Sequence, residues 1–334
     1  MVSDDRMLDM SKTLNILSDS KNNLFQSEQW EDYQEALGNK TFRIKLNDVS
    51  VLLIKKPLYK DKSYLYCPKG PVCDEETWSV LKRQAGEIAE KESCVFLRVE
   101  PFEISQKIVV DLKLKKVGTY SPNSKQFSPM NTRVLDIEPR DDDILAQMKP
   151  KWRYNIKLGY RKGVQVRMST KLEDLRKFHE LSLGLKERGY TPFELAHYER
   201  MLYSLTKGKH IALFIAEYEN KILSAILVTF YGGVATYLHG ASSDECRELM
   251  PNHLAQWEAI LESRRRGCVL YDFWGIAPDE DENHPWAGIT RFKRGFGGEV
   301  VKFAGAYDCI FDKKWYSAFH TYNFLRKVTK NEHR

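Results

Sequence analysis

The sequence predicts an α/β protein with two domains, and three observations lead to this prediction. The chain has 334 residues, which is more than one hydrophobic core usually holds. Its hydrophobic content of 42% and its charged content of 29% are ordinary for a globular protein. Strand-like and helix-like patterns alternate along the chain in two similar passes, which is typical of mixed α/β folds.

The first pass begins with a β-hairpin and ends with an apolar strand. Apolar and polar residues alternate in both arms of the hairpin, and the helix that follows has apolar residues at helical spacing. The expected elements are strands over residues 42–46, 49–55 and 64–67, a helix over 75–91 and a strand over 94–99.

The second pass begins with a helix that is interrupted near Pro150, since proline cannot continue the helical hydrogen-bond pattern. Two of its strands pair through a Glu-Asn-Lys turn. The expected elements are a helix over 141–162, a strand over 164–167, helices over 171–188 and 192–206, strands over 210–218, 222–230 and 235–239, a helix over 253–266 and a strand over 269–273. A strand over 307–311 and a helix over 315–327 follow.

Two bulk properties bear on where the protein works. The longest apolar candidate, residues 210–238, is broken by Glu217, Glu219, Asn220 and Lys221, whereas a membrane span needs about 18 uninterrupted apolar residues. The first residues are acidic and polar, and they lack the basic and then apolar order of a signal peptide. We therefore expect no transmembrane segment and a cytoplasmic location.

The six cysteines are scattered along the chain and include no CxxC pair. Most of them lie in strand-like context, so buried free thiols are favoured over zinc ligands and disulfides. We therefore expect no metal site. The cysteines are Cys67, Cys73, Cys94, Cys246, Cys268 and Cys309.

The net charge of +6 is modest, but many cations gather in one segment. Residues 149–167 hold seven basic residues and no acidic one, together with Trp152, Tyr154 and Tyr160. A basic helix interleaved with aromatics suits a phosphate-rich partner, either RNA or a substrate that carries a pyrophosphate. A solvated helix face is the alternative. The cations are Lys149, Lys151, Arg153, Lys157, Arg161, Lys162 and Arg167.

Residues 271–298 are the most informative stretch of the chain. An apolar strand runs into an acidic loop (residues 279–282), and the sequence GITRFKRGFGG follows. This sequence places Lys293 between aromatic residues and a glycine-rich turn. Glycine lets the backbone approach a ligand closely, aromatic rings exclude water, and a fixed ammonium suits a developing oxyanion. A tight turn with a solvated lysine is the alternative interpretation.

This stretch resembles the signature of the Fem aminoacyltransferases, the peptidoglycan bridge enzymes. Members of that family carry Tyr-Asp-Phe-x-Gly-Ile at a strand end and then Gly-Ile-x-x-Phe-Lys-x-Gly-Phe-Gly-Gly. Six further segments resemble family motifs in the same order, so that the resemblance covers about residues 24–320. They are residues 25–30, 66–72, 96–101, 129–136, 152–153 and 237–242.

The resemblance implies a fold of two tandem GNAT-like (acyl-CoA N-acyltransferase-like) domains with mixed sheets. The order of hairpin, strand, helix and strand in each pass suits such a unit. The implied domains are residues 1–140, completed by 306–334, and residues 141–305. Some members insert a long coiled-coil arm in the second domain, but residues 171–205 leave room for two ordinary helices, so no arm is expected.

The implied reaction is amide formation between an aminoacyl-tRNA and an amine on the stem peptide of a peptidoglycan precursor. No cofactor is implied. The precursor is either lipid-linked or UDP-linked, and contact with the inner face of a membrane would be peripheral. Lys293 would face the oxyanion and the tRNA 3′ end, Phe292 would pack against it, and Glu100 would accept a proton from the attacking amine. A capping acid before Pro101 is the alternative role for Glu100.

The resemblance also implies residues that bind the two substrates. Tyr237 and His239 lie at i and i+2 of one strand and are expected to share a face, although an interior histidine is the alternative for His239. Asp272 is expected to be a structural hydrogen-bond acceptor. The implied precursor contacts are Trp30, Lys69, Arg98, Tyr237 and His239, with Trp30 as core or groove wall. The implied tRNA contacts are Lys149, Lys151, Arg153, Lys157, Arg161 and Lys162.

Two departures from the family leave the form of the acceptor open. Members that act on the nucleotide-linked precursor carry a lysine where this chain has Gln34 and an arginine where it has Phe193, although Arg188 lies close by in sequence. A Fem-like protein with a changed acceptor, or with no activity, is therefore one alternative.

Two further classes of protein are alternatives. An acyl-CoA-dependent transferase would need a phosphate-binding glycine loop that opens a helix, whereas strand-like residues 299–303 follow the glycines here. A protein that only binds RNA through its basic segment leaves residues 271–298 unexplained.

Overall fold

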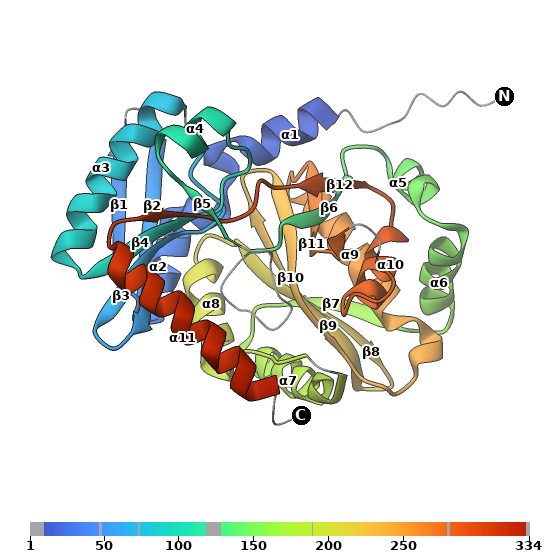
Figure 1. Ribbon diagram of the computed structural model, residues 1–334. Helices are drawn as coiled ribbons and strands as arrows, with labels where there is room; N and C mark the ends of the chain where they lie inside the picture. The colour runs from blue at the N-terminus through green and yellow to red at the C-terminus, as the bar shows by residue number, and fades with distance from the viewer. Residues whose placement is uncertain are drawn as a thin grey trace. The chain divides into compact units, whose positions relative to one another are not determined.

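The computed structural model describes residues 10–46, 49–72, 74–117, 128–188, 190–278 and 281–331. These residues form two compact units, each built around its own mixed sheet (Figure 1). The six-stranded unit holds the described residues of 25–119 and 303–334, and the seven-stranded unit those of 1–24 and 120–302. The α/β class with two mixed sheets is confirmed, and no coiled-coil arm occurs within the described residues.

The six-stranded sheet has an antiparallel meander followed by a parallel pair. Strands β1, β2 and β3 are antiparallel, and helix α3 (Glu75–Lys91) then crosses over so that β4 lies parallel to β3. The side chain of Asp74 caps α3 by accepting from the Thr77 amide. In sheet order the strands are β1 (Thr41–Leu46), β2 (Val49–Tyr59), β3 (Lys62–Cys67), β4 (Cys94–Val99), β13 (Tyr307–Ile310) and β5 (Lys115–Lys116).

Helices cover both faces of this sheet. Residues of α3 pack with Leu65 and Leu97 on one face, while α11 (Lys313–Asn331) brings Tyr316 against Tyr64 and Phe96 on the other. The opposite faces follow from the alternation of side chains along β3 and β4. The remaining helices are η2 (Leu24–Gln26), α2 (Glu28–Ala36) and α4 (Gln106–Asp111).

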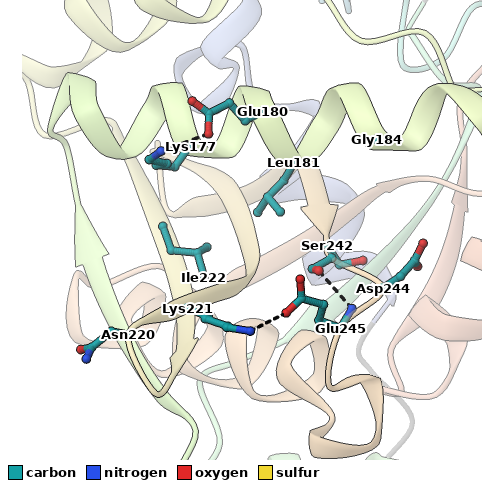
Figure 2. A pocket seen from close by; sticks show the side chains of 11 residues that line it. Lys177, Glu180, Leu181, Gly184, Asn220, Lys221, Ile222, Ser242, Asp244 and Glu245 are labelled. Carbon is teal, nitrogen blue, oxygen red and sulfur yellow. Dashed lines mark hydrogen bonds and ion pairs between the residues drawn. The ribbon is translucent and has the colours of Figure 1, made fainter.

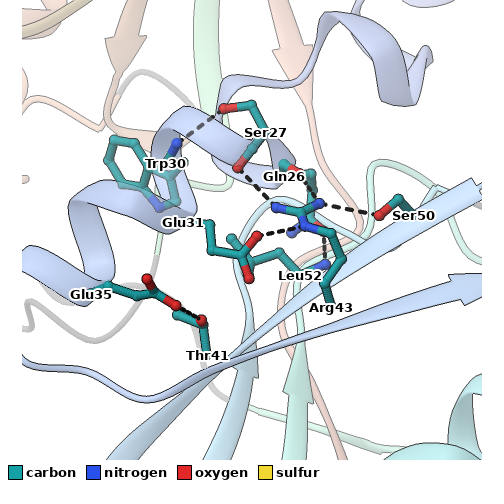
Figure 3. A network of polar contacts seen from close by, with 9 residues as sticks. All are labelled: Gln26, Ser27, Trp30, Glu31, Glu35, Thr41, Arg43, Ser50 and Leu52. Carbon is teal, nitrogen blue, oxygen red and sulfur yellow. Dashed lines mark hydrogen bonds and ion pairs between the residues drawn. The ribbon is translucent and has the colours of Figure 1, made fainter. Parts of the chain in front are cut away.

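Arg43 on β1 joins helix α2 to the edge of the sheet through hydrogen bonds. Its guanidinium donates to Glu31 at 2.6 Å and to the backbone oxygens of Gln26 and Ser27 at 2.9 and 3.0 Å (Figure 3). Ser27 caps the helix by accepting from the Trp30 amide. The orientation of α2, and hence of the side chains on it, is therefore fixed by a half-buried polar network.

The seven-stranded sheet repeats the same plan. Strands β7, β8, β9 and β10 are antiparallel, and helix α9 (Pro251–Arg265) crosses over so that β11 lies parallel to β10. Residues of α9 such as Trp257 and Ile260 form the core with Phe214 and Val228 of the sheet. In sheet order the strands are β12 (Glu299–Lys302), β6 (Asn131–Asp136), β11 (Leu270–Gly275), β10 (Val234–Ser242), β9 (Lys221–Tyr231), β8 (Ile211–Tyr218) and β7 (Gln165–Ser169).

The helix expected over residues 141–162 is two helices in the structure, because Pro150 begins the second one. The buried residues of the second helix, Asn155, Ile156 and Gly159, recur at helical spacing. The helices of this unit are α1 (Met10–Ser18), η1 (Ser20–Asn22), α5 (Asp141–Gln147), α6 (Pro150–Arg161), α7 (Leu172–Leu183), η3 (Gly184–Arg188), α8 (Leu195–Thr206), η4 (Arg247–Leu249) and α10 (Ala287–Arg294).

The structure divides the chain differently from the implied domains. Residues 10–24 and 128–140, expected in the first domain, belong to the seven-stranded unit, and residues 303–305, expected in the second, belong to the six-stranded unit. Residues 131–136, expected in the first domain, form β6 of the seven-stranded sheet, where they pair antiparallel with both β11 and β12. The reason is that the apolar residues of β6, Val134 and Leu135, are fully buried there. Strand β13 and helix α11 belong to the six-stranded unit.

Within the described residues, no helix combines the length and the apolar character that crossing a membrane requires. Five of the cysteines are free thiols, and four of these are buried, as expected. Cys73 lies outside the described residues.

Candidate active site

Lys293 lies in the last turn of α10 and is buried, with 5% of its surface exposed. Its Nζ donates to the backbone oxygen of Gly275 at 2.7 Å and lies 5.4 Å from the ring centre of Tyr237. Burial lowers the pKa of Lys293 to about 7, and the nearby charge of Asp272 opposes this shift only in part. The alternative of a solvated lysine in a turn is therefore wrong. Lys293 is a helical residue in a low-dielectric site.

The carbonyl that holds Lys293 is presented by an irregular end of β11. The register against β6 shifts between Asp272 and Gly275, and Trp274 takes a left-handed conformation with φ 64°. Asp272 stabilises this bend, because it accepts from the Trp274 amide at 2.7 Å and from the Thr132 hydroxyl. The structural role expected for Asp272 is confirmed.

Tyr237, rather than Phe292, is the ring beside the ammonium. Phe292 packs edge-on against His253 and Phe296, with ring centres 5.2 Å apart in each case. The expectation that Phe292 packs against Lys293 is corrected because neighbouring helical residues point about 100° apart, so that Phe292 faces the core instead. Phe292 therefore fixes the orientation of α10.

A β-bulge separates the two residues that were expected to share a face of β10. Tyr237 lies opposite Val228 on β9, whereas His239 lies opposite Leu227, the next residue along. Adjacent residues of a strand face opposite sides, so the bulge puts Tyr237 and His239 on opposite faces. Tyr237 faces the core beside Lys293, and burial raises its pKa.

His239 contacts aromatic residues from the other face of the sheet. Its ring centre lies 5.2 Å from that of Tyr198 and 5.8 Å from that of Phe193. Phe193 in turn stacks on His197, with ring centres 3.9 Å apart and an interplanar angle of 6°. The structure therefore places His239 in an aromatic cluster and not beside Lys293.

The glycines after Lys293 allow close packing against other backbone segments of the same chain. Gly298 has φ 73°, and a Cβ there would lie 2.3 Å from the backbone oxygen of Val134. Gly297 has φ 90°, a conformation that favours glycine. These residues turn the chain from α10 into β12, so the close approach expected of the glycines is an approach to neighbouring backbone.

In the six-stranded unit, Glu100 and Lys69 lie together at the end of β4. Glu100 is 5% exposed and accepts from the Tyr66 hydroxyl at 2.8 Å and from the Lys69 amide at 3.4 Å. The Lys69 ammonium lies 3.4 Å from the ring centre of Phe303. A carboxylate and an ammonium are thus held in a mostly buried polar cluster.

Arg98 and Trp30, the other predicted residues of this unit, have visible structural partners. Arg98 is 3% exposed and forms a bidentate ion pair with Asp308 on β13, with both N–O distances 2.7 Å. Although burial opposes it, Asp308 raises the pKa of Arg98. Trp30 is buried between Phe25 and Tyr33, with ring centres 4.7 and 4.9 Å away. The structure thus places Trp30 in the core.

Lys56 on β2 is a candidate residue that the sequence analysis missed. Its Nζ donates to the side-chain oxygen of Gln34 on α2 at 2.9 Å, and burial lowers its pKa to about 8. Lys56 thus brings a cation to Gln34, the position at which the sequence departs from the family pattern. The neighbouring Lys55 points to the other face and pairs with Glu92. The paired lysines in the sequence were the available signal, because one of two adjacent strand residues must face each side.

The basic segment is mostly exposed, and Arg161 lies over the ring of Tyr154 at 5.9 Å from its centre. Arg153 donates to backbone oxygens at the end of α5, and Arg167 pairs with Asp174 and Glu217, so these two cations are engaged. Among the described residues, no carboxylate lies within ion-pair distance of the others, which are exposed: Lys149, Lys151, Lys157, Arg161 and Lys162.

A separate surface depression lies on the seven-stranded unit beneath α7 (Figure 2). Its lysines are neutralised locally, since Lys177 pairs with Glu180 at 3.1 Å and Lys221 with Glu245 at 3.0 Å. None of the residues predicted from the sequence lines it. Within the part of the chain that is described, no cluster of three or more His, Cys, Asp or Glu side chains could hold a metal ion.

The chain is similar in sequence to known proteins along most of its length. The model of the FemAB family matches residues 16–219 and 203–324. The chain is 24% identical to the lipid II:glycine glycyltransferase of Staphylococcus epidermidis and 23% identical to that of Staphylococcus aureus, in each case over 90% of this chain and 91% of the relative.

Solved structures share the fold. The crystal structure of FemX superposes with a TM-score of 0.79 at 21% identity, covering 92% of this chain and 97% of that one. The structure of L-PGS from Bacillus licheniformis gives a TM-score of 0.55 at 10% identity, with the same coverage of 92% and 97%. Together with the match of the family model along most of the sequence, these findings show that the chain belongs to the FemAB family.

Proposed function

We propose that this protein transfers an aminoacyl group from aminoacyl-tRNA to an amine on the stem peptide of a lipid-linked peptidoglycan precursor. The observation that carries the proposal is the buried Lys293, which is held by a backbone oxygen beside Tyr237 and has a pKa near 7. The names of the staphylococcal relatives support a transferase acting on lipid II.

In the proposed reaction the acceptor amine attacks the ester carbonyl of the aminoacyl-tRNA and forms a tetrahedral oxyanion. An ammonium has three N–H donors, and Gly275 takes one of those on Lys293, so two are available for the oxyanion. Collapse of the intermediate forms the amide and breaks the bond to the terminal ribose oxygen. That oxygen leaves with the proton that the attacking amine gives up. Glu100 is the proposed acceptor of a proton from the attacking amine, and its carboxylate accepts from the Tyr66 hydroxyl.

We assign binding of the acceptor precursor to residues of the six-stranded unit. Lys56 is a half-buried cation whose hydrogen-bond partner is the neutral Gln34, so it is suited to a phosphate of the precursor. In the proposal Lys69 adds a second cation to this side of the substrate. Trp30 would stabilise α2, which carries Gln34, and Arg98 would act by joining β4 to β13.

Two further features of the seven-stranded unit support the choice of substrates. Phe193 stacks on His197 where an arginine would favour a nucleotide-linked precursor, which supports the lipid-linked form. The exposed cations of α6 suit the tRNA backbone. Dependence on aminoacyl-tRNA would place the reaction in the cytoplasm, with peripheral contact at the inner face of the membrane.

The proposal is tested by incubating the purified protein with a set of charged tRNAs and each form of the precursor, and by following the product by mass. Lys293→Met is the matched inactive control. We expect transfer from charged tRNA to the lipid-linked precursor and none from acetyl-CoA. Transfer from acetyl-CoA at a comparable rate, with none from any charged tRNA, would overturn the proposal.

A further inference from the structure

The basic helix α6 and the lysine-bearing helix α10 are joined end to end by hydrogen bonds. The Lys149 amide, at the start of α6, donates to the Gly295 oxygen at 2.9 Å. The indole Nε1 of Trp152, one turn further along α6, donates to the Phe292 oxygen at 3.0 Å. Both acceptors lie at the carboxyl end of α10, beside Lys293, and the Phe292 oxygen also accepts from the Gly295 amide at 3.2 Å.

The packing around the indole is equally close. A Cβ on Gly295 would lie 1.9 Å from the Cε2 atom of Trp152, so the indole fills the space that a side chain at that position would need. On its other side, Trp152 packs edge-on against His253 with ring centres 5.4 Å apart. The position of α10 is therefore set by an aromatic residue of α6.

His253, on α9, completes the joint between the helices. Its ring contacts Phe292 at 5.2 Å, and its Nε2 lies 3.1 Å from the Asn155 amide nitrogen on α6. Burial and the charge of Lys151 lower the pKa of His253 to about 4, so the ring is neutral at pH 7 and can accept from Asn155. The side chain of His253 on α9 thus contacts both α6 and α10 and links them to the core.

We propose that Trp152 is a positioning residue for Lys293: by holding the carboxyl end of α10 it keeps the Lys293 ammonium at Gly275 and away from water. This inference rests on the proposed function and adds a consequence to it. The cations for the tRNA backbone and the cation for the reacting ester stand on two helices that these hydrogen bonds join. Binding of phosphates along α6 therefore positions the ester relative to Lys293.

The effect of Trp152 on Lys293 can be measured through the pKa of Lys293, without an activity assay. The titratable groups that the described residues place near it are Asp272 on β11 and Tyr237 on β10, while the neutral His253 faces Phe292. Its low pKa arises first from loss of water. Loosening α10 admits water and lets the pKa rise towards that of an ordinary lysine.

The test uses Trp152→Phe, which keeps a ring but removes the N–H donor. Three quantities are measured: the dissociation constant for tRNA, the single-turnover rate of transfer, and the titration of 13C-labelled Lys293 by NMR, assigned by its loss in Lys293→Met. We expect unchanged tRNA affinity, a rate about tenfold lower, as for loss of one hydrogen bond, and a titration midpoint about one pH unit higher.

Two further variants make the result specific. Gly295→Ala pushes against the indole from the other side and is expected to raise the Lys293 midpoint in the same way. Trp78→Phe removes the same atoms from a buried indole in the core of the six-stranded unit and is expected to leave the midpoint unchanged. The proposal would be overturned if the Lys293 titration midpoint in Trp152→Phe equalled that of the parent protein, or if it rose equally in Trp78→Phe. Because the NMR titration needs no substrate, this outcome is distinct from a failure of the proposed function.

Discussion

Lys293 in the seven-stranded unit and Arg98 in the six-stranded unit are both buried cations, 5% and 3% exposed, but their surroundings differ. Arg98 has a bidentate carboxylate partner, Asp308, which raises its pKa. Lys293 donates to a neutral carbonyl, and no carboxylate among the described residues lies within ion-pair distance of it. Burial therefore lowers its pKa to about 7.

The difference shows how a buried charge can serve either stability or chemistry. A paired cation is already neutralised, so removing it leaves an uncompensated carboxylate and weakens the fold. A cation held only by a carbonyl costs stability, and it can interact strongly with an anion that forms during a reaction. Lys56, with its neutral partner Gln34, belongs with Lys293 in this comparison.

The largest effect on stability is expected for Arg98→Met. This change leaves Asp308 buried without its partner, and the free energy of unfolding should fall by about 3–5 kcal/mol. Urea denaturation measures it. Adding Asp308→Leu to the variant should restore part of the loss, because both charges are then absent. A loss below about 1 kcal/mol in the single variant would show that the pair is not a structural anchor.

Lys293→Met should affect turnover strongly and stability little, the opposite of Arg98→Met. Methionine keeps the apolar stem and removes the charge, so turnover should fall on the order of 100-fold or more while precursor binding changes little. The free energy of unfolding should not fall, because the cost of burying the ammonium is removed. A folded variant that transfers at the parent rate would remove Lys293 from the mechanism.

Lys56→Gln tests whether the second cation of this kind contacts the precursor. We expect KM for the precursor to rise about tenfold, the usual scale for one charge-assisted hydrogen bond, with kcat nearly unchanged. Lys55→Gln is the matched control, because Lys55 is adjacent on β2 but pairs with Glu92 on the other face. Equal effects of the two changes would indicate a general loss of positive charge rather than a site at Lys56.

The smallest effect is expected from the exposed cations of α6. If they contact tRNA phosphates, affinity should fall steeply between about 50 and 200 mM salt. Replacing both Lys157 and Arg161 with Gln should flatten the slope of log K against log salt by roughly one to two. Filter binding at several salt concentrations measures the slope. The same slope in the double variant would show that this face is only solvated.

Much of the fold was predictable from the sequence because it depends on local patterns. The hairpin, the crossover helix and the parallel strand of each unit follow from apolar periodicity. The place of residues 131–136 was not predictable in this way, because which sheet a strand joins depends on contacts with distant strands. The pairing of Arg98 with Asp308, 210 residues apart, is of the same kind.

The candidate site was predictable in its residues but less so in its geometry. Lys293 was found from its neighbours in sequence, but its helical conformation and its partner Gly275 were not. The bulge that separates Tyr237 from His239 leaves no mark in the alternation of β10, so the shared face was wrongly expected. Lys56 was missed because its role depends on Gln34, which lies 22 residues away on another element.

The central claim is that Lys293 acts as a buried ammonium whose charge is lost near neutral pH. The direct measurement is the single-turnover transfer rate as a function of pH, for the parent and for Lys293→Met. The ratio of the two rates cancels the ionisation of the acceptor amine. Since the pKa of Lys293 is lowered to about 7, we predict that the ratio is high below pH 7 and falls towards one as the pH rises through that value. A ratio that is constant through neutral pH, or that rises, would contradict the account.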